Sequence, residues 1–278
     1  MINRGGIGPN SLLDGAIELR GILGSAVEHL GTRIASGEWG EGEAVTREAD
    51  LVDQLGVSRS VIRESFRILG AKGMIRSKTS DGTRIQPRSK WRLLDPDVME
   101  WRIKAGDTES LLRDLLKLRL VMEPGIAYLA AQSAHQEHIE RVKAAWQAKQ
   151  YVYDNATGSH EARREAFITT DLEFHRALIG AVQSELLEQL FSVIEAALGL
   201  LLDLQMTAKG YTSTMIGMDE SHALHERVFQ AFIARDPEAT EAAMRTLIQC
   251  AIDDAKQGFQ LLDQSPGSDG AVQRRQSG

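Results

Sequence analysis

The residues from about 96 to 262 consist of long segments rich in Leu, Ala, Glu and Arg, and this pattern limits the fold more than any other feature. Such residues favour helices, whereas strands favour β-branched and aromatic residues, and only 5% of this chain is aromatic. The whole chain has only six prolines to interrupt helices. The sequence therefore predicts a mainly α fold with an antiparallel bundle of six to seven helices, at about residues 96–105, 108–133, 135–154, 160–182, 184–208, 218–234 and 236–262.

The N-terminal part predicts a different arrangement, in which three helices precede a hairpin. Apolar residues recur at helical spacing from Gly21 to Ser36, and Thr46 is the expected N-cap of a second helix. Ser58 is the expected N-cap of a third helix, which runs to about Lys72. The segments "MIRSKT" and "TRIQP", separated by "SDG", predict two strands joined by a turn. This order is that of a winged helix-turn-helix domain.

Positive charge is concentrated in one segment, although the chain as a whole has a formal net charge of -7. The segment from Arg59 to Arg92 contains ten basic and two acidic residues, a net charge of +8, so the rest of the chain carries -15. This asymmetry indicates that the segment contacts a polyanion. The alternative is a basic face that is simply solvated.

The third predicted helix carries arginines at 59, 63 and 67, beside its apolar stripe. The major groove of B-DNA admits one helix, and an arginine near the start of that helix can donate two hydrogen bonds to a guanine. A glycine in the turn of the wing allows the backbone to approach a phosphate. The predicted DNA contacts are Ser58, Arg59, Ser60, Arg63, Arg67, Lys78, Gly82 and Thr83. For Arg63 and Arg67 the alternative is a salt bridge within the chain.

The segment "READLVDQLGVSRSVIRESFRILGAKGMIRSKTSDGTRI" resembles the N-terminal domain of GntR-type bacterial transcription regulators. The resemblance implies a winged helix-turn-helix that binds double-stranded DNA. One position differs, because many members have an arginine where this chain has Ala49. A DNA contact of the second helix is therefore missing here or is supplied by Arg47.

Three later segments resemble the effector domain of the FadR-like branch of this family, a bundle of six or seven helices. They are "LLKLRLVMEPGIAYLAA", "DLEFHRALIGAVQSELL" and "SHALHERVFQAFIARDPEATEAAMRTL". The resemblance implies a small-molecule effector site in the bundle, which in many members contains a metal ion.

The residues themselves support a metal site. Asp171 and His175 are four residues apart on one predicted helix, so their side chains share a face, and His225 on a later helix is the expected third ligand. Two histidines and a carboxylate leave coordination positions open, which the carboxylate and hydroxyl of a hydroxy acid can fill. Arg119 is the predicted effector-binding residue, because its guanidinium can pair with that carboxylate. Zinc is the predicted divalent ion, with nickel and manganese as alternatives.

Metal-binding members of the branch have a further histidine where this chain has Leu247. His222, three residues before His225, is the candidate substitute because it lies on about the same helix face. Otherwise three protein ligands hold the ion, or the site contains no metal and its polar residues bind a polyhydroxy acid unaided.

The linker "SKWRLLDPDVMEW" resembles the link found in sugar-acid regulators of this branch, such as galactonate- or gluconate-responsive repressors. We therefore predict a homodimeric repressor, not an enzyme, that binds a palindromic operator and a small carboxylate, with a sugar acid expected. One alternative is a metal-dependent enzyme that uses Asp171, His175 and His225. The other is a metal-free regulator that senses an acyl thioester, or a constitutive architectural DNA binder.

The remaining features predict location and domain bounds. A single cysteine, no apolar run of about 18 residues and no secretory signal together favour the cytoplasm and exclude a membrane span. The predicted domains are a mobile N-terminus (1–18), a winged helix-turn-helix domain (19–88), a linker with a first connecting helix (89–107), a helical effector-binding and dimerisation domain (108–262) and a disordered tail (263–278).

Overall fold

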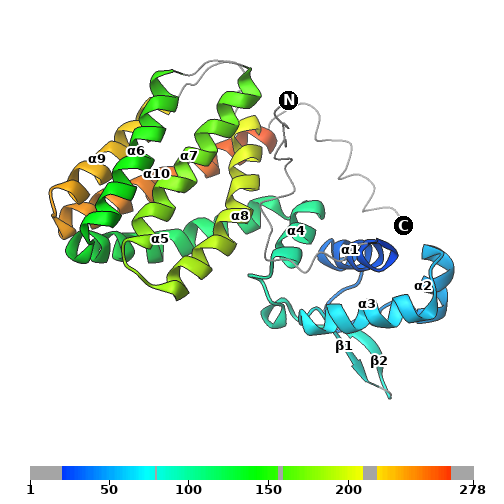
Figure 1. Ribbon diagram of the computed structural model, residues 1–278. Helices are drawn as coiled ribbons and strands as arrows, with labels where there is room; N and C mark the ends of the chain where they lie inside the picture. Colours follow the sequence, from blue (N-terminus) through cyan, green and yellow to red (C-terminus); the bar gives the residue numbers. More distant parts are fainter. Residues whose placement is uncertain (1–20, 79, 156–158, 209–217, 264–278) are drawn as a thin grey trace, which may run out of the picture. The chain divides into compact units, whose positions relative to one another are not determined.

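The computed structural model (Figure 1) describes residues 21–78, 80–155, 159–208 and 218–263. The predicted mobile segment 1–18 and nearly all of the predicted tail 263–278 lie outside these residues. Contacts between residues divide the chain into two compact units, residues 1–111 and 112–278. Helices predominate among the described residues, so the predicted mainly α fold is confirmed.

The first unit is a winged helix-turn-helix, as predicted. Its three helices are α1 (Gly21–Ala35), α2 (Glu48–Leu55) and α3 (Arg59–Ala71). Strands β1 (Ile75–Lys78) and β2 (Gly82–Ile85) pair antiparallel to form the wing. A short 3-10 helix (Arg88–Lys90) and α4 (Pro96–Lys104) follow. Apolar side chains of the four α-helices and both strands share one core, which includes Leu30, Leu51, Ile62, Leu69, Ile75 and Trp101.

Helix α3 has the cap and the apolar stripe that the sequence predicted. The Ser58 hydroxyl accepts a hydrogen bond from the Val61 amide at 3.3 Å, which satisfies one of the amides left free at a helix start. Ile62, Phe66 and Leu69 are buried at i, i+4 and i+7. Each such side chain contributes about 1.5–3 kcal/mol when it leaves water, and this burial fixes which face of α3 stays exposed.

The start of α2 differs from the prediction. Thr46 was expected to cap it, but the helix begins at Glu48 after Arg47, and Arg47 makes no side-chain capping hydrogen bond. Glu48 and Asp50 instead place negative charge in the first turn, where it interacts favourably with the helix dipole. The other end follows the prediction, because Gly56 terminates the helix in the left-handed conformation.

Lys72 joins the end of α3 to the start of α4. Its ammonium lies 2.6 Å from Asp95 and 2.7 Å from Asp97. Asp95 also caps α4 by accepting from the Asp97 and Val98 amides. Lys72, one of the ten basic residues of the charged segment, is therefore mostly buried and neutralised locally rather than directed at an external polyanion.

Helices α1 and α4 pack against each other, and Gly31 of α1 lies close to Trp101 of α4. A Cβ atom placed there would lie 2.3 Å from the ring of Trp101, which is itself buried. Because this overlap forces the core to shift, we expect Gly31→Ala to lower the free energy of unfolding by about 1–3 kcal/mol, measured by urea denaturation.

Gly70→Ala in α3 is the matched control for this change. Its Cβ would have its nearest neighbour at 3.8 Å, an ordinary contact. Because alanine favours helix over glycine, this variant is expected to keep or gain stability. Equal losses in the two variants would contradict the close packing at Gly31.

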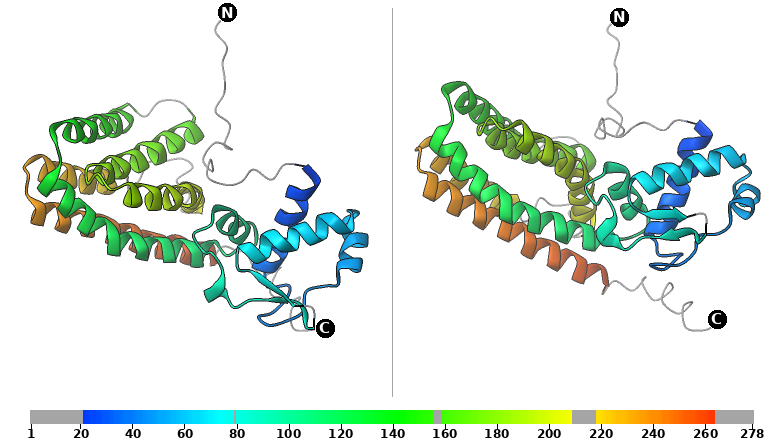
Figure 2. Two further views of the ribbon diagram at one scale, coloured as in Figure 1. Left: turned by 60° about the horizontal axis from the view of Figure 1, so that its bottom comes forward. Right: turned by 90° about the horizontal axis from the view of Figure 1, so that it is seen from below.

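The second unit is a helical bundle. It contains most of α5 (Thr108–Ser133), followed by α6 (Gln136–Asp154), α7 (His160–Gly180), α8 (Glu185–Ala208), α9 (Met218–Ile233) and α10 (Pro237–Asp263). Helix α7 packs against both α6 and α8, and α9 packs along α10, as Figures 1 and 2 show. The predicted helices match these within two residues at each end. No helix among the described residues is long and apolar enough to cross a membrane.

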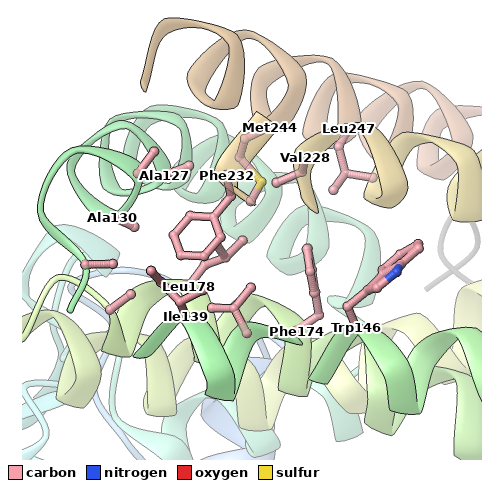
Figure 3. Close-up of a cluster of buried hydrophobic side chains, with 14 of the residues drawn as sticks. Ala127, Ala130, Ile139, Trp146, Phe174, Leu178, Val228, Phe232, Met244 and Leu247 are labelled. Carbon is pink, nitrogen blue, oxygen red and sulfur yellow. The ribbon is translucent and has the colours of Figure 1, made fainter. Parts of the chain in front are cut away.

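One apolar core joins five of these helices, namely α5, α6, α7, α9 and α10. Figure 3 shows side chains from five helices meeting there, among them Ala127, Trp146, Phe174, Leu178, Val228, Phe232, Met244 and Leu247. One side of α7 and one side of α9 are packed into this core, so the rotation of each helix about its own axis is fixed. The direction in which their polar side chains point is therefore fixed as well. The core thereby positions the buried polar site.

Candidate functional site

The first candidate surface is the outer face of α3. The side chains of the five predicted contact residues there are all exposed: Ser58, Arg59, Ser60, Arg63 and Arg67. The hydroxyls of Ser58 and Ser60 lie 2.7 Å apart. Within the described part of the chain, the Arg59 guanidinium has no ion-pair or hydrogen-bond partner. This face thus presents positive charge at the start of a capped helix.

The two later arginines pair with surface carboxylates. Arg63 Nε lies 3.0 Å from Glu48 of α2, and an Arg67 Nη lies 2.6 Å from Glu64. Both arginine side chains nevertheless remain 72% exposed. An exposed pair of this kind contributes about 0–1 kcal/mol, so either guanidinium can exchange its carboxylate for a phosphate or base. The salt bridges weighed as alternatives exist, but they leave both side chains accessible.

The wing presents the remaining predicted contacts. Lys78 lies opposite Gly82 in the β1–β2 register, and both are exposed. Gly82 has φ 70°, a conformation that favours glycine. The Thr83 and Ser77 hydroxyls lie 2.8 Å apart across the two strands. Asp81 accepts a hydrogen bond from Arg84 at 2.7 Å, which holds that arginine within the wing. The exposed Lys78 has no ion-pair partner among the described residues.

The second candidate site is a buried polar cluster within the helical bundle. Helix α7 supplies Asp171 and His175, α9 supplies His225, and one donor atom of each lies within 4.8 Å of the others. Helices α5 and α6 add three charged side chains to the cluster. All six residues are at most 7% exposed: Arg119, Glu123, Lys149, Asp171, His175 and His225.

His225 directs an unprotonated ring nitrogen at Asp171. Its Nδ1 lies 2.7 Å from the Ser221 carbonyl oxygen, which can only accept, so Nδ1 carries the proton. Burial, followed by Lys149, lowers the pKa of His225 to about 4, so the ring is neutral near pH 7 and Nε2 has a lone pair. No group in the described residues donates a hydrogen bond to this buried Nε2. It lies 3.0 Å from Asp171 Oδ1. Two electron-rich atoms thus face each other, an arrangement that a cation stabilises.

His175 is held from both sides. Its Nδ1 lies 2.6 Å from Glu123 Oε2, and its Nε2 accepts from the Arg119 guanidinium at 3.1 Å. Burial alone would raise the pKa of Glu123, but Arg119 and then His175 outweigh it and lower that pKa to about 2. Glu123 therefore stays ionised and orients His175, as carboxylates commonly do behind ligating histidines.

Asp171 has a cationic neighbour from α6. Lys149 Nζ donates a hydrogen bond to Asp171 Oδ1 at 2.8 Å. Burial would raise the pKa of Asp171, but Lys149, followed by His225, holds it well below its usual value. The cluster thus contains two carboxylates and two basic side chains, with Arg119 paired to Glu123 and Lys149 paired to Asp171.

His222, the candidate fourth ligand, belongs to a different set of contacts. Its Nε2 lies 2.9 Å from the Gln150 side-chain oxygen, and its ring stacks on Tyr153 at 3.9 Å between centroids. It is not part of the three-residue group whose donor atoms converge. Leu247 is buried in the apolar core, so it offers no ligand. In the described residues the converging ligands are therefore three.

Two members of the cluster were not singled out from the sequence. Glu123 is four residues after Arg119, and this i, i+4 spacing was a usable signal for a buried pair. Lys149 follows Val142 and Trp146 at helical spacing on the apolar face of α6. A lysine in that position indicates a buried cation that needs a partner.

A cavity of about 510 Å³ opens on another face of α7, away from the ligand-bearing one. There Arg176 contacts Glu195 at 2.6 Å, and burial raises the pKa of Glu195. None of the three converging ligands lines this cavity. Its lining includes His138, Arg141, Glu173, Arg176, Phe191 and Glu195.

Comparison with known proteins connects both surfaces to one family. Residues 24–85 match the model of the bacterial regulatory proteins of the gntR family, and residues 114–249 match the FCD domain. The chain is 29% identical over 219 residues to the galactonate operon transcriptional repressor of Escherichia coli, covering 79% of this chain and 90% of that protein. It is 29% identical over 212 residues to the regulator LutR of Bacillus subtilis, covering 76% and 90%.

A solved structure supports the fold. The structure of Lar, described as controlling expression of the Listeria monocytogenes agr system, has a TM-score of 0.56 and 14% identity, with 86% of this chain and 99% of that chain covered. At that identity the likeness concerns architecture alone. The two domain matches, together with the order of helices and wing, lead to one conclusion: the chain belongs to the GntR family of bacterial transcription regulators and carries an FCD domain.

Proposed function

We propose that this regulator is a repressor that binds a palindromic operator as a homodimer and responds to a small carboxylate, a sugar acid, held in its helical bundle. The similarity to a galactonate operon repressor supports both the repression and the ligand class. Two copies related by a two-fold axis would present two copies of α3 to two half-sites. The sugar acid can change DNA affinity only if it binds the two arrangements of the dimer with different affinity.

The DNA-binding part of the proposal assigns roles along one face of the first unit. Arg59 and Arg63, with the hydroxyls of Ser58 and Ser60, would contact base edges in the major groove. Arg67, Lys78 and the backbone near Gly82 and Thr83 would contact phosphates, which position the domain without reading sequence. The observation that carries this assignment is the exposure of the α3 arginines directly after a side-chain cap.

The effector-binding part rests on the buried cluster. Asp171, His175 and His225 would hold a divalent ion. Zinc is proposed, with nickel or manganese as alternatives. The converging donor atoms and the unpaired Nε2 of His225 suit such an ion. The ion, when bound, supplies open coordination positions for a carboxylate and a neighbouring hydroxyl. Arg119, held in place by Glu123, would direct one N–H pair at the carboxylate.

The proposal is tested by operator selection followed by ligand titration. The full chain is incubated with random double-stranded DNA, and the bound sequences are recovered and sequenced. We expect enrichment of an inverted repeat and two chains per DNA duplex by light scattering. Galactonate and gluconate, with and without zinc, are then added while DNA affinity is followed by fluorescence anisotropy.

Two outcomes would contradict the proposal. Absence of any enriched DNA sequence would remove the DNA-binding assignment. Turnover of a sugar acid in the presence of divalent metal would favour a metal-dependent enzyme that uses the same three ligands.

A further inference from the structure

Lys149 lies in a place where a lysine requires an internal partner. It follows Val142 and Trp146 on the face of α6 that packs into the apolar core, and its side chain is 1% exposed. Burying an ammonium without a partner is costly, and the partner here is Asp171 Oδ1 at 2.8 Å. Nζ also lies 4.4 Å from the centre of the Phe167 ring, a favourable cation–π contact.

The ammonium contacts the same carboxylate oxygen that faces His225. Lys149 Nζ and His225 Nε2 lie 2.8 Å and 3.0 Å from Asp171 Oδ1. An ion shared by Asp171 and His225 would therefore meet a positive charge already in contact with one of its ligands. Because the site is buried, that repulsion is weakly screened.

The charge balance of the cluster points the same way. Arg119 pairs with Glu123 and Lys149 pairs with Asp171, so each carboxylate of the cluster already has a cationic partner. A divalent ion would add two positive charges to a balanced, desolvated group. Arg119 pairs with Glu123 and also donates to His175 Nε2 at 3.1 Å, so the cation in direct contact with Asp171 is Lys149.

We propose that Lys149 is the resident cation of this pocket and that a divalent ion binds Asp171 only by displacing its ammonium. This inference rests on the metal site of the proposed function and makes Lys149 the residue that sets metal affinity. A neutral residue at this position would give a site with higher affinity for metal. With lysine present, the cluster is stable and charge-balanced without any ion.

The test is a zinc titration of the full chain, by competition with a chromophoric chelator, in the wild type and in Lys149→Met, Lys149→Gln and Lys149→Arg. We expect Lys149→Met to bind zinc at least about tenfold more tightly than the wild type, because one nearby positive charge is lost. Lys149→Arg keeps the charge and should resemble the wild type. Chelator alone should leave the thermal midpoint of the wild type unchanged.

Lys149→Met also leaves Asp171 buried without its cation, so this variant is expected to be less stable than the wild type in the absence of metal. Lys149→Gln covers that case, because its amide can still donate to Asp171 while carrying no charge. Tighter zinc binding by either neutral variant supports the inference. Wild-type zinc affinity in both neutral variants would overturn it, as would a wild type that is purified with one zinc per chain and unfolds when the zinc is removed.

Failure of this inference is distinguishable from failure of the proposed function. Operator binding is measured on the same preparations, and it depends on the first unit. If no variant binds zinc while the operator is still bound, the metal site and this inference are both rejected, and the DNA-binding assignment stands.

Discussion

Replacing Arg63 by alanine is expected to weaken specific operator binding while the fold stays intact. A bidentate arginine–guanine contact is worth about 1–3 kcal/mol, so affinity should fall by roughly 5- to 150-fold, and the preference for the selected sequence over random DNA should narrow. Stability should change by less than about 1 kcal/mol, because the native partner of Arg63 is the exposed Glu48. Fluorescence anisotropy with the selected operator and urea denaturation measure the two quantities.

Glu48→Ala is the control, because it removes the same salt bridge from the other side. If Arg63 acts on DNA, this variant keeps or improves operator affinity, since a competing carboxylate is gone. If the salt bridge merely supports the domain, both variants lose affinity together. Unchanged operator binding by Arg63→Ala would refute the assignment outright.

Replacing Asp171 by alanine is expected to remove the response to sugar acid and to destabilise the second unit. The substitution takes away a proposed ligand and leaves the ammonium of Lys149 buried without its carboxylate. Breaking a buried ion pair from one side typically costs about 3–5 kcal/mol. Urea denaturation measures the loss, and anisotropy titrations measure whether galactonate or gluconate still alters DNA affinity.

The double variant Asp171→Ala with Lys149→Met separates these two effects. With both charges removed, most of the lost stability should return, whereas the response to sugar acid and zinc should not. DNA binding should be retained, because the residues proposed to contact the operator lie in the first unit. A double variant that still changes its DNA affinity normally on addition of sugar acid would exclude Asp171 from the effector site.

The fold was largely accessible from the sequence because its elements are specified locally. Ser58 and Asp95 cap helices through amides two or three residues away, and Gly56 ends one by its own backbone freedom. Thr46 shows the limit of such reasoning. It is a good capping residue, but the helix begins one position later than a Thr46 cap would require, with Arg47 at the N-cap position. At that end, the acidic first turn of α2 supplied what the cap did not.

The site was accessible only where its residues share a helix. Asp171 and His175 are one turn apart, so their common face follows from helix geometry alone. His222 and His225 are also about one turn apart, yet their donor atoms belong to different environments, with Gln150 for one and Asp171 for the other. The spacing of two residues along a helix predicts that their side chains share a face. It does not predict which residues of other helices each side chain will contact.

The amino-acid sequence by itself determined the helices, the wing, the exposed arginine stripe and the Asp171–His175 pair, since each depends on contacts within a few residues. Only the tertiary structure decided that Glu48 pairs with Arg63, that Glu123 orients His175 and that Lys149 faces Asp171. Those contacts join residues 15 to 52 positions apart. They depend on how each helix is rotated when its apolar face enters the core, and that rotation is set by the packing of all the helices together.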